Sequence, residues 1–223
     1  MISPSYVKQL TGQWRAHAPR LWWGDRLDAR FLVADAVRAL RDVRVLDVGC
    51  NAGVMLAQVP SVNVRVGLDL SEEALRLARV MERDTVLVRG DMRSLPFPDA
   101  SFDVVLFCGM VEVLPGPRKA AAIREVARVL RPRGALHLTT LNRRYPRYHQ
   151  HPGVVTYEEL EALLHPHFDA VIRGFNPVPP FPYGLPNRVL ARIPRIWAIL
   201  ERWMERGVGL RGSCTFVVRA VKR

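Results

Sequence analysis

The sequence has few cysteines and no long apolar run, and both absences narrow the class of protein. Its three cysteines, Cys50, Cys108 and Cys214, are far apart and form no Cys-x-x-Cys pair. This pattern argues against a disulfide framework or a zinc site and favours reduced cysteines. No stretch approaches the roughly 20 apolar residues of a membrane span, and residues 1–13 lack the apolar core of a signal peptide. We therefore expect a cytoplasmic protein.

Acidic residues are also scarce relative to basic ones. The 223 residues include 33 Lys and Arg against 21 Asp and Glu, which gives a net charge of +12. Such an excess is found in proteins that bind nucleic acids or anionic membranes. Here the arginines are dispersed rather than gathered in one tract, which favours a solvated basic surface. A phosphate-binding surface stays open as the alternative.

The chain is organised around residues 44–53, Arg-Val-Leu-Asp-Val-Gly-Cys-Asn-Ala-Gly. An apolar run typical of a buried parallel strand ends there at a turn with two glycines. Glycine permits a positive φ and lets a ligand approach the backbone, and Asn51 belongs to a residue type that tolerates the same region. A second expected strand, 64–68, ends at Asp69, 20 residues after Gly49. An acid at this spacing is placed to bind a ribose, so the pair predicts a nucleoside cofactor.

The family of that cofactor site follows from the remaining motif positions. The dehydrogenase fingerprint Gly-x-Gly-x-x-Gly fits poorly, because Asn51 and Val54 take its second and third glycine positions. The stretch instead resembles the first motif of class I S-adenosylmethionine (SAM) methyltransferases, in the type 11-like, small-molecule branch, with Asn51 as a departure. The resemblance covers about residues 43–141, and its further blocks, in matching order, are Gly67–Ser71, Arg89–Met92, Leu95–Pro98, Ser101–Val105 and Leu130–Gly134.

The resemblance implies an α/β fold with a doubly wound, mostly parallel, seven-stranded Rossmann-like sheet. It also implies an antiparallel last strand and an N-terminal helical cap. We expect a single methyltransferase domain over residues 1–223. Its parts are the helical cap at 1–41, the SAM-binding core at 42–141, a substrate-recognition insert and lid at 142–212, and the last strand at 213–223.

Periodicity and capping signals place the individual elements. Strands are expected at 45–48, 64–68, 85–88, 102–107, 135–141, 168–172 and 214–221. Helices are expected at 27–40, 54–59, 72–83, 117–130, 156–164 and 189–204. The helix at 117–130 should bury Ala120, Ile123, Val126, Ala127 and Leu130. The basic amphipathic helix at 189–204 either packs onto its own domain, the more common case, or meets a lipophilic substrate or an anionic membrane.

The resemblance further implies SAM as the cofactor and assigns residues to it. Asp91 is expected to accept a hydrogen bond from the adenine amino group, and the Met92 amide to serve a ring nitrogen. The N-terminus of the helix at 54–59 would favour the carboxylate of SAM. The full expected cofactor set is Asp47, Gly49, Cys50, Asn51, Gly53, Asp69, Leu70, Asp91, Met92, Cys108, Gly109 and Met110.

Residues for the methyl acceptor are less well defined. Many relatives carry Glu-His where this chain has Glu112-Val113, so the resemblance supplies no general base. Glu112 either orients a substrate amine or hydroxyl or bonds the nearby backbone. The polar, aromatic loop after the fifth strand is a good place for substrate recognition. It offers Tyr145, Tyr148 and His149, so the weak catalytic candidates are Glu112, Tyr145 and His149.

Two further features of the sequence bear on the candidate substrate and metal sites. Trp22 and Trp23 precede the first expected helix, and they either cover the cofactor and substrate or pin the N-terminal segment to the core. The pairs His149-x-His151 and His165-x-His167 lack cysteine or carboxylate companions at a familiar spacing, so no metal site is expected.

These features predict transfer of a methyl group from SAM to a small or lipophilic metabolite by in-line displacement, with S-adenosylhomocysteine as the product. The residues do not distinguish an oxygen, nitrogen or carbon nucleophile. One alternative is an RNA- or ribosome-associated methyltransferase, although no RNA-binding module and no Asn/Asp-Pro-Pro-Tyr motif is present. The other is a protein that binds SAM without turnover, since the histidine is missing and Asn51 alters the glycine turn.

Overall fold

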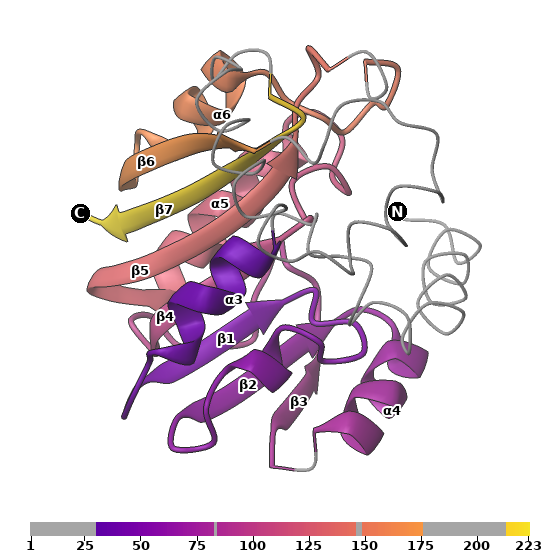
Figure 1. The fold of residues 1–223 in the computed structure, drawn as a ribbon, viewed down its shortest axis with the longest axis vertical. Coiled ribbons are helices and arrows are strands. Elements are labelled where there is room, and N and C mark those ends of the chain that lie inside the picture. The colour runs from indigo at the N-terminus through magenta and orange to yellow at the C-terminus, as the bar shows by residue number, and fades with distance from the viewer. Residues whose placement is uncertain (1–29, 83, 146–148, 176–212) are drawn as a thin grey trace, which may run out of the picture.

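The computed structural model describes residues 30–82, 84–145, 149–175 and 213–223. The expected N-terminal cap, the lid and the helix at 189–204 lie wholly or mostly outside these residues. The described chain forms a seven-stranded sheet in the order β3-β2-β1-β4-β5-β7-β6 (Figure 1). Its strands are β1 (Arg44–Val48), β2 (Val64–Asp69), β3 (Val86–Arg89), β4 (Phe102–Cys108), β5 (Leu130–Leu141), β6 (Phe168–Phe175) and β7 (Thr215–Lys222).

The sheet confirms the predicted doubly wound topology. β1 pairs in parallel with β2 and β4, β2 with β3, and β4 with β5. β7 runs antiparallel between β5 and β6. The chain leaves β1 toward β2 on one side and later returns to pair β4 on the other side. In sheets with such a reversal, ligands bind at the carboxyl ends of the strands on either side of it, which here are β1 and β4.

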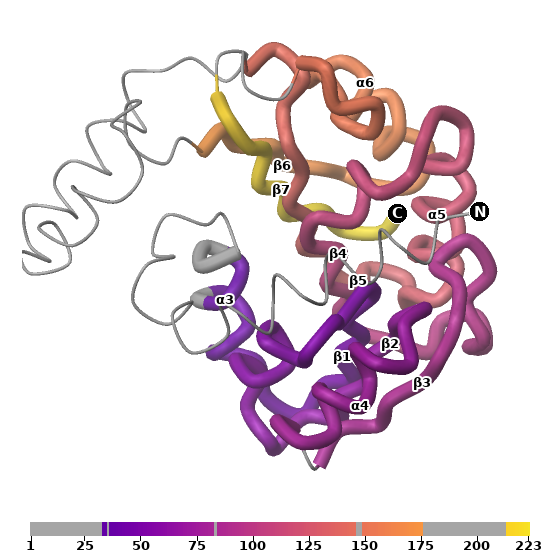
Figure 2. Tube along the Cα trace, turned by 90° about the vertical axis from the view of Figure 1, so that its right-hand side faces the viewer, coloured from indigo at the N-terminus to yellow at the C-terminus, as the bar shows by residue number. Residues whose placement is uncertain are grey.

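Helices cover both faces of the sheet in three layers. One face packs against α3 (Arg30–Arg38), the short 3-10 helix η1 (Leu56–Gln58) and α4 (Glu72–Met81). The other face carries the largest apolar cluster, to which α5 (Arg118–Val129) and α6 (Tyr157–Leu164) contribute. Figure 2 shows α6 beside β6 and β7 at one end of the sheet and α4 at the other end. The core is therefore divided by the sheet, and the strand ends stay available for a site.

The predicted helix caps are present. Ser71 precedes α4, and its Oγ accepts a hydrogen bond from the Ala74 amide at 3.2 Å. Thr156 and Glu159 form the reciprocal capping box at the start of α6. Each cap satisfies a backbone amide that the helix itself leaves without an acceptor. The local sequence was sufficient to place both helix starts.

The prediction of a helix at 54–59 was wrong, because only the three-residue η1 forms there. Val59 leaves the helical region, with φ −83° and ψ 123°, because it precedes Pro60. Gly53 at the other end has φ 81°, which no continuous helix allows. A single turn this short provides no helix N-terminus for a carboxylate, so the expected role of the segment toward SAM loses its support.

The predicted buried stripe of α5 needs one correction. Ala120 is exposed, and Lys119 and Ala122 are buried instead, with 5% and 0% of their surface accessible. Positions 119, 122, 123, 126 and 127 follow the helical repeat, so the geometry of the helix turns Lys119 inward. Lysine is seldom buried, so the residue type alone gives no reason to place Lys119 in the core.

His137 is a second buried ionisable side chain, in the middle of β5. Only 6% of its surface is accessible. Burial, followed by the positive charge of Arg219, lowers the pKa of His137 from 6.5 to about 4. The folded protein therefore holds this imidazole in its neutral form at neutral pH.

We predict that the free energy of unfolding decreases as the pH falls from 7 toward 4. Below pH 6.5 the unfolded chain takes up a proton on His137, whereas the folded chain resists protonation until about pH 4. The contribution is present above pH 6.5 and is lost as the pH falls, by roughly 3 kcal/mol in all. Urea unfolding at several pH values should show that His137→Leu removes this part of the pH dependence. His165→Asn, at an exposed position, should keep it; equal pH dependence in wild type and His137→Leu would contradict the assignment.

Candidate functional site

The predicted turn after β1 adopts the conformation that its residues favour. Gly49, Asn51 and Gly53 have φ values of 77°, 47° and 81°, all in the left-handed region. The amides of Gly49 and Cys50 donate to the carbonyl oxygen of Leu68 at 2.7 and 3.0 Å. These hydrogen bonds hold the turn against the end of β2.

Asp69 at the tip of β2 joins the turn to the next helix. Its Oδ2 accepts a hydrogen bond from the Asn51 amide at 3.0 Å, and its Oδ1 accepts one from the Ser71 amide at 2.8 Å. Burial raises the pKa of Asp69 above its ordinary value, and these two amides oppose that change. A carboxylate offers about four acceptor positions, so Asp69 retains capacity for ligand hydroxyls.

The side chain of Asn51 provides a second acceptor group at the same place. Its Oδ1 is buried and has no hydrogen-bond partner among the described residues. Leaving such an acceptor unsatisfied costs free energy, so the position suits a hydroxyl or ammonium group of a ligand. A nucleoside with free ribose hydroxyls fits the donor requirement of Asn51 and Asp69 together.

The tip of β4 lies directly against the turn. The Gly109 amide donates to Thr139 in β5 at 2.9 Å, and Gly109 has φ 71°. The chain then places Met110 over Gly49, so closely that a Cβ on Gly49 would overlap the Met110 sulfur. These contacts bring the predicted residues of β1, β2 and β4 to one place, and the Met110 side chain covers Gly49 there.

The remaining residues predicted around the turn differ in surroundings. Cys50 is buried, and its pKa is raised by that burial and by the negative charges of Asp47 and Asp69. Its thiol therefore stays protonated and is not a nucleophile. Asp47 is 3% exposed within the sheet, whereas Leu70 is 43% exposed beyond the tip of β2. Leu70 thus offers an apolar surface at the rim of the site.

Asp91, predicted to contact adenine, is engaged by a neighbour that the sequence reading overlooked. Arg93 Nε lies 3.0 Å from both carboxylate oxygens of Asp91, and Arg93 Nη2 lies 2.5 Å from Oδ2. These hydrogen bonds lower the pKa of Asp91. A hydrogen bond from adenine would have to share the carboxylate with this arginine. Met92 beside it is 9% exposed, and its role at the adenine ring stays a prediction.

The acceptor candidates lie around the ends of β4 and β5. Glu112 Oε2 accepts a hydrogen bond from Thr140 Oγ1 at 2.8 Å. Tyr145 is partly buried, and its amide donates to the Asn142 carbonyl at 3.1 Å, whereas His149 is exposed. The structure therefore brings Glu112 to the strand ends and leaves His149 at the surface. The other three candidates, Trp22, Trp23 and Tyr148, lie outside the described residues.

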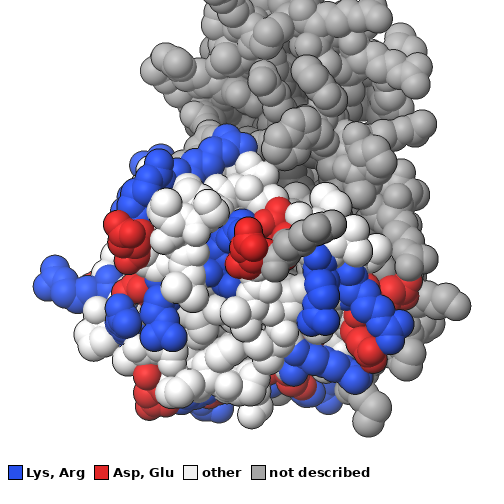
Figure 3. Space-filling view, turned by 90° about the horizontal axis from the view of Figure 1, so that it is seen from below, with Lys and Arg blue, Asp and Glu red and all other residues white. Residues whose placement is uncertain are grey.

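Charges of both signs are interspersed on the described surface (Figure 3). Arg128 pairs with Glu125, Arg131 with Asp103, and Arg223 with Asp169. Residues 1–29 and 176–212, outside the described part, hold 10 basic and 4 acidic residues, so they carry half of the net charge of +12. Within the described residues no group of three or more His, Cys, Asp or Glu side chains could hold a metal ion.

Comparisons with known proteins agree with this geometry. The profile of the methyltransferase domain family matches residues 46–138, which run from β1 to β5 and carry the turn, Asp69 and the β4 tip. Residues 46–138 of this chain therefore resemble a methyltransferase domain. Similar proteins include the ubiquinone biosynthesis O-methyltransferases of Thiobacillus denitrificans, 35% identical over 121 residues, and of Xanthomonas oryzae, 37% identical over 111 residues. These matches cover 51% and 47% of this chain and 51% and 45% of the relatives, so the chain spans about half their length.

Solved structures agree on the fold of this chain. A TehB-like SAM-dependent methyltransferase from Corynebacterium glutamicum superposes with a TM-score of 0.65 at 18% identity, covering 99% of this chain and 100% of that one. A SAM-dependent methyltransferase from Aquifex aeolicus gives 0.62 at 17% identity, with 99% of both chains covered. Within the described part, none of the helices has the length and apolarity that crossing a bilayer requires.

Sequence reasoning missed several contacts that position the candidate site residues. Arg93 stands two positions after Asp91, a spacing that a search for local ion pairs would have found. Thr140 gave no such signal, because its contact with Glu112 joins residues 28 positions apart. Met110 was assigned to the cofactor, but its packing on Gly49 depends on β1 and β4 being neighbours in the sheet.

We predict that Gly49→Ala destabilises the fold by on the order of 2–4 kcal/mol. The substitution combines left-handed backbone strain with overpacking against Met110. Gly116→Ala, also at a positive φ but with no atom within 4 Å of the added carbon, should carry the strain alone. Urea unfolding should show that Met110→Ala partly rescues Gly49→Ala. Equal destabilisation by the two glycine substitutions would exclude the predicted overlap.

Proposed function

We propose that the protein is a SAM-dependent methyltransferase that acts on a small or lipophilic metabolite. The observation that carries this proposal is the meeting of the left-handed Gly49 turn, the unsatisfied Asn51 Oδ1 and the Asp69 carboxylate at the reversal point of the sheet. Two acceptor groups beside such a turn suit an adenosyl ligand. The match of residues 46–138 to the methyltransferase domain supports the same cofactor.

Specific residues would hold the cofactor in this proposal. Asp69 would accept hydrogen bonds from the ribose hydroxyls, and Asn51 Oδ1 would receive a donor from the ligand. Leu70 and Met110 would provide apolar contacts on two sides, since one is exposed at the rim and the other covers Gly49. SAM supplies a methyl group on a positively charged sulfur, which is already activated toward a nucleophile.

The task left to this chain is to position the methyl acceptor. Holding two reactants in line can supply several kcal/mol of the barrier reduction without a dedicated base. Glu112, at the tips of β4 and β5, is the described carboxylate that we propose for orienting the acceptor. Met110 and Leu70 would help to exclude water, which strengthens electrostatic interactions near the sulfonium.

An oxygen nucleophile on a small molecule is our proposal for the acceptor group. It draws on the relatives, which are named as O-methyltransferases of ubiquinone biosynthesis. The interspersed charges of the described surface favour a small acceptor over RNA. The substitution of Val113 for the histidine of many relatives is compatible with a transfer that depends on positioning.

The proposal can be tested by binding and transfer measurements on the full chain. Isothermal calorimetry should detect binding of both SAM and S-adenosylhomocysteine. Methyl-labelled SAM should then label members of a panel of phenols, catechols and amines, and should leave total RNA unlabelled. Absence of SAM binding would refute the cofactor assignment, and labelling of RNA alone would replace the small acceptor with a nucleic acid.

We predict that Asp69→Ala weakens SAM binding by on the order of 1–3 kcal/mol, because ribose hydroxyls lose their acceptor. The amides of Asn51 and Ser71 also lose a partner, so the unfolding free energy should be measured alongside binding. Asp99→Ala is the matched control, because its exposed carboxylate pairs with Arg128 instead. Unchanged affinity in Asp69→Ala would remove Asp69 from the site.

A further inference from the structure

The carboxylate of Glu112 is fixed by contacts that binding of the cofactor does not require. Glu112 follows β4 in a segment whose Val111 and Leu114 side chains are 1% and 2% exposed. Its Oε1 lies 3.6 Å from the position of a Cβ on Gly109, and its Oε2 accepts the hydrogen bond from Thr140 at 2.8 Å. The carboxylate therefore spans the tips of β4 and β5, beside the strand end that carries Met110.

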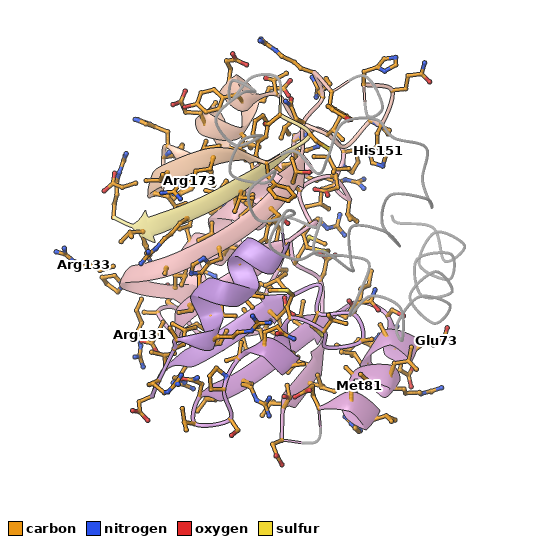
Figure 4. The ribbon with its side chains drawn as sticks, in the orientation of Figure 1. Glu73, Met81, Arg131, Arg133, His151 and Arg173 are labelled. Carbon is orange, nitrogen blue, oxygen red and sulfur yellow. The ribbon has the colours of Figure 1, made fainter. Side chains whose placement is uncertain are left out.

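The main chain of Glu112 is held by a second segment, far away in sequence. A Cβ on Gly153 would overlap the carbonyl group of Glu112, so only glycine allows this approach. Gly153 is itself fixed, since its amide donates to His151 Nδ1 at 3.2 Å and the next residue, Val154, is fully buried. Figure 4 shows His151 on the side toward which β1 points, opposite Arg131 and Arg133. The contact of Gly153 thus lies at the carboxyl ends of the strands.

Lys119 holds the end of the same segment. Its Nζ donates a hydrogen bond to the carbonyl oxygen of Leu114, and its side chain is buried in the first turn of α5. Burial lowers the pKa of Lys119, as does Arg143, while the carboxylates of Glu159 and Glu112 oppose the change. Burying an ammonium group is unfavourable unless it is paired and hydrogen-bonded. Lys119 therefore links the Leu114 backbone to α5 by a hydrogen bond and interacts electrostatically with Glu112.

A hydrogen bond to the carboxylate and two contacts with the backbone around it are typical of a preorganised site rather than a surface side chain. An ionised carboxylate only accepts hydrogen bonds, and it offers about four acceptor positions, one of which is taken by the Thr140 hydroxyl. We propose that Thr140, Gly153 and Lys119 are positioning residues that hold the Glu112 carboxylate to accept a hydrogen bond from the methyl acceptor. The nucleophile of the acceptor then carries a hydrogen-bond donor, as the O–H of the proposed oxygen nucleophile does. This inference rests on the proposed methyltransferase activity and names the residues that position its substrate.

The first test separates turnover from cofactor binding. Thr140→Val and Glu112→Gln should lower kcat on the labelled panel compound by on the order of tenfold to a hundredfold, since misplacing a reacting group has effects of this size. The affinity for SAM should stay within about twofold of wild type, because neither residue belongs to the predicted cofactor set. Thr139→Val, the same substitution at the preceding residue, is the control and should retain kcat. Wild-type kcat in Thr140→Val and Glu112→Gln would overturn the proposal.

A second test needs no methyl acceptor and reports on the Glu112 carboxylate independently of activity. In protein labelled with ¹³C-glutamate, the Glu112 carboxyl resonance is assigned by its loss in Glu112→Gln. Thr140→Val and Gly153→Ala should shift this resonance, whereas Thr139→Val and Gly116→Ala should leave it in place. An unshifted resonance in Thr140→Val and Gly153→Ala would contradict the proposed restraints. If Gly153→Ala unfolds, the measurement on Thr140→Val alone decides. Failure of the wild type to bind SAM would refute the proposed function alone.

Discussion

The hydrogen bond from the Asn51 amide to the Asp69 carboxylate connects the tips of β1 and β2, and the candidate cofactor site depends on it. The same carboxylate accepts the Ser71 amide just before α4. One partly buried side chain therefore holds both the glycine turn and the residue that caps the next helix. Removing it would leave two backbone amides without their acceptor, so the candidate cofactor residues and the local fold share one support.

The acceptor side of the site depends on a different kind of restraint. Gly109 and Met110 are placed by the pairing of β4 with β1, whereas Glu112 is held by contacts from β5, α5 and the segment that contains Gly153. The two sides share only the tip of β4. The cofactor candidates and the acceptor candidate are therefore positioned by different parts of the fold.

The parts of the fold that follow local rules could be predicted from the sequence. The strands, the cap at Ser71 and the capping box at Thr156 depend on neighbouring residues, and the spacing of Gly49 and Asp69 predicted that the turn and the acid meet at one place. The helix expected after the turn failed because Pro60 acts on Val59. Contacts between distant segments carried no local signal. In the sequence, Gly153 resembles any loop glycine, and only the fold shows its contact with Glu112. Lys119 resembles a solvent-exposed lysine, and only the orientation of α5 shows that it is buried.

The account is tested most directly by a crystal structure of the full chain with S-adenosylhomocysteine. It predicts the adenosyl group at the tips of β1 and β2, with the ribose hydroxyls within hydrogen-bond distance of Asp69 and a ligand donor on Asn51 Oδ1. A ligand bound elsewhere, or a ribose without contact to Asp69 in that complex, would contradict the central claim.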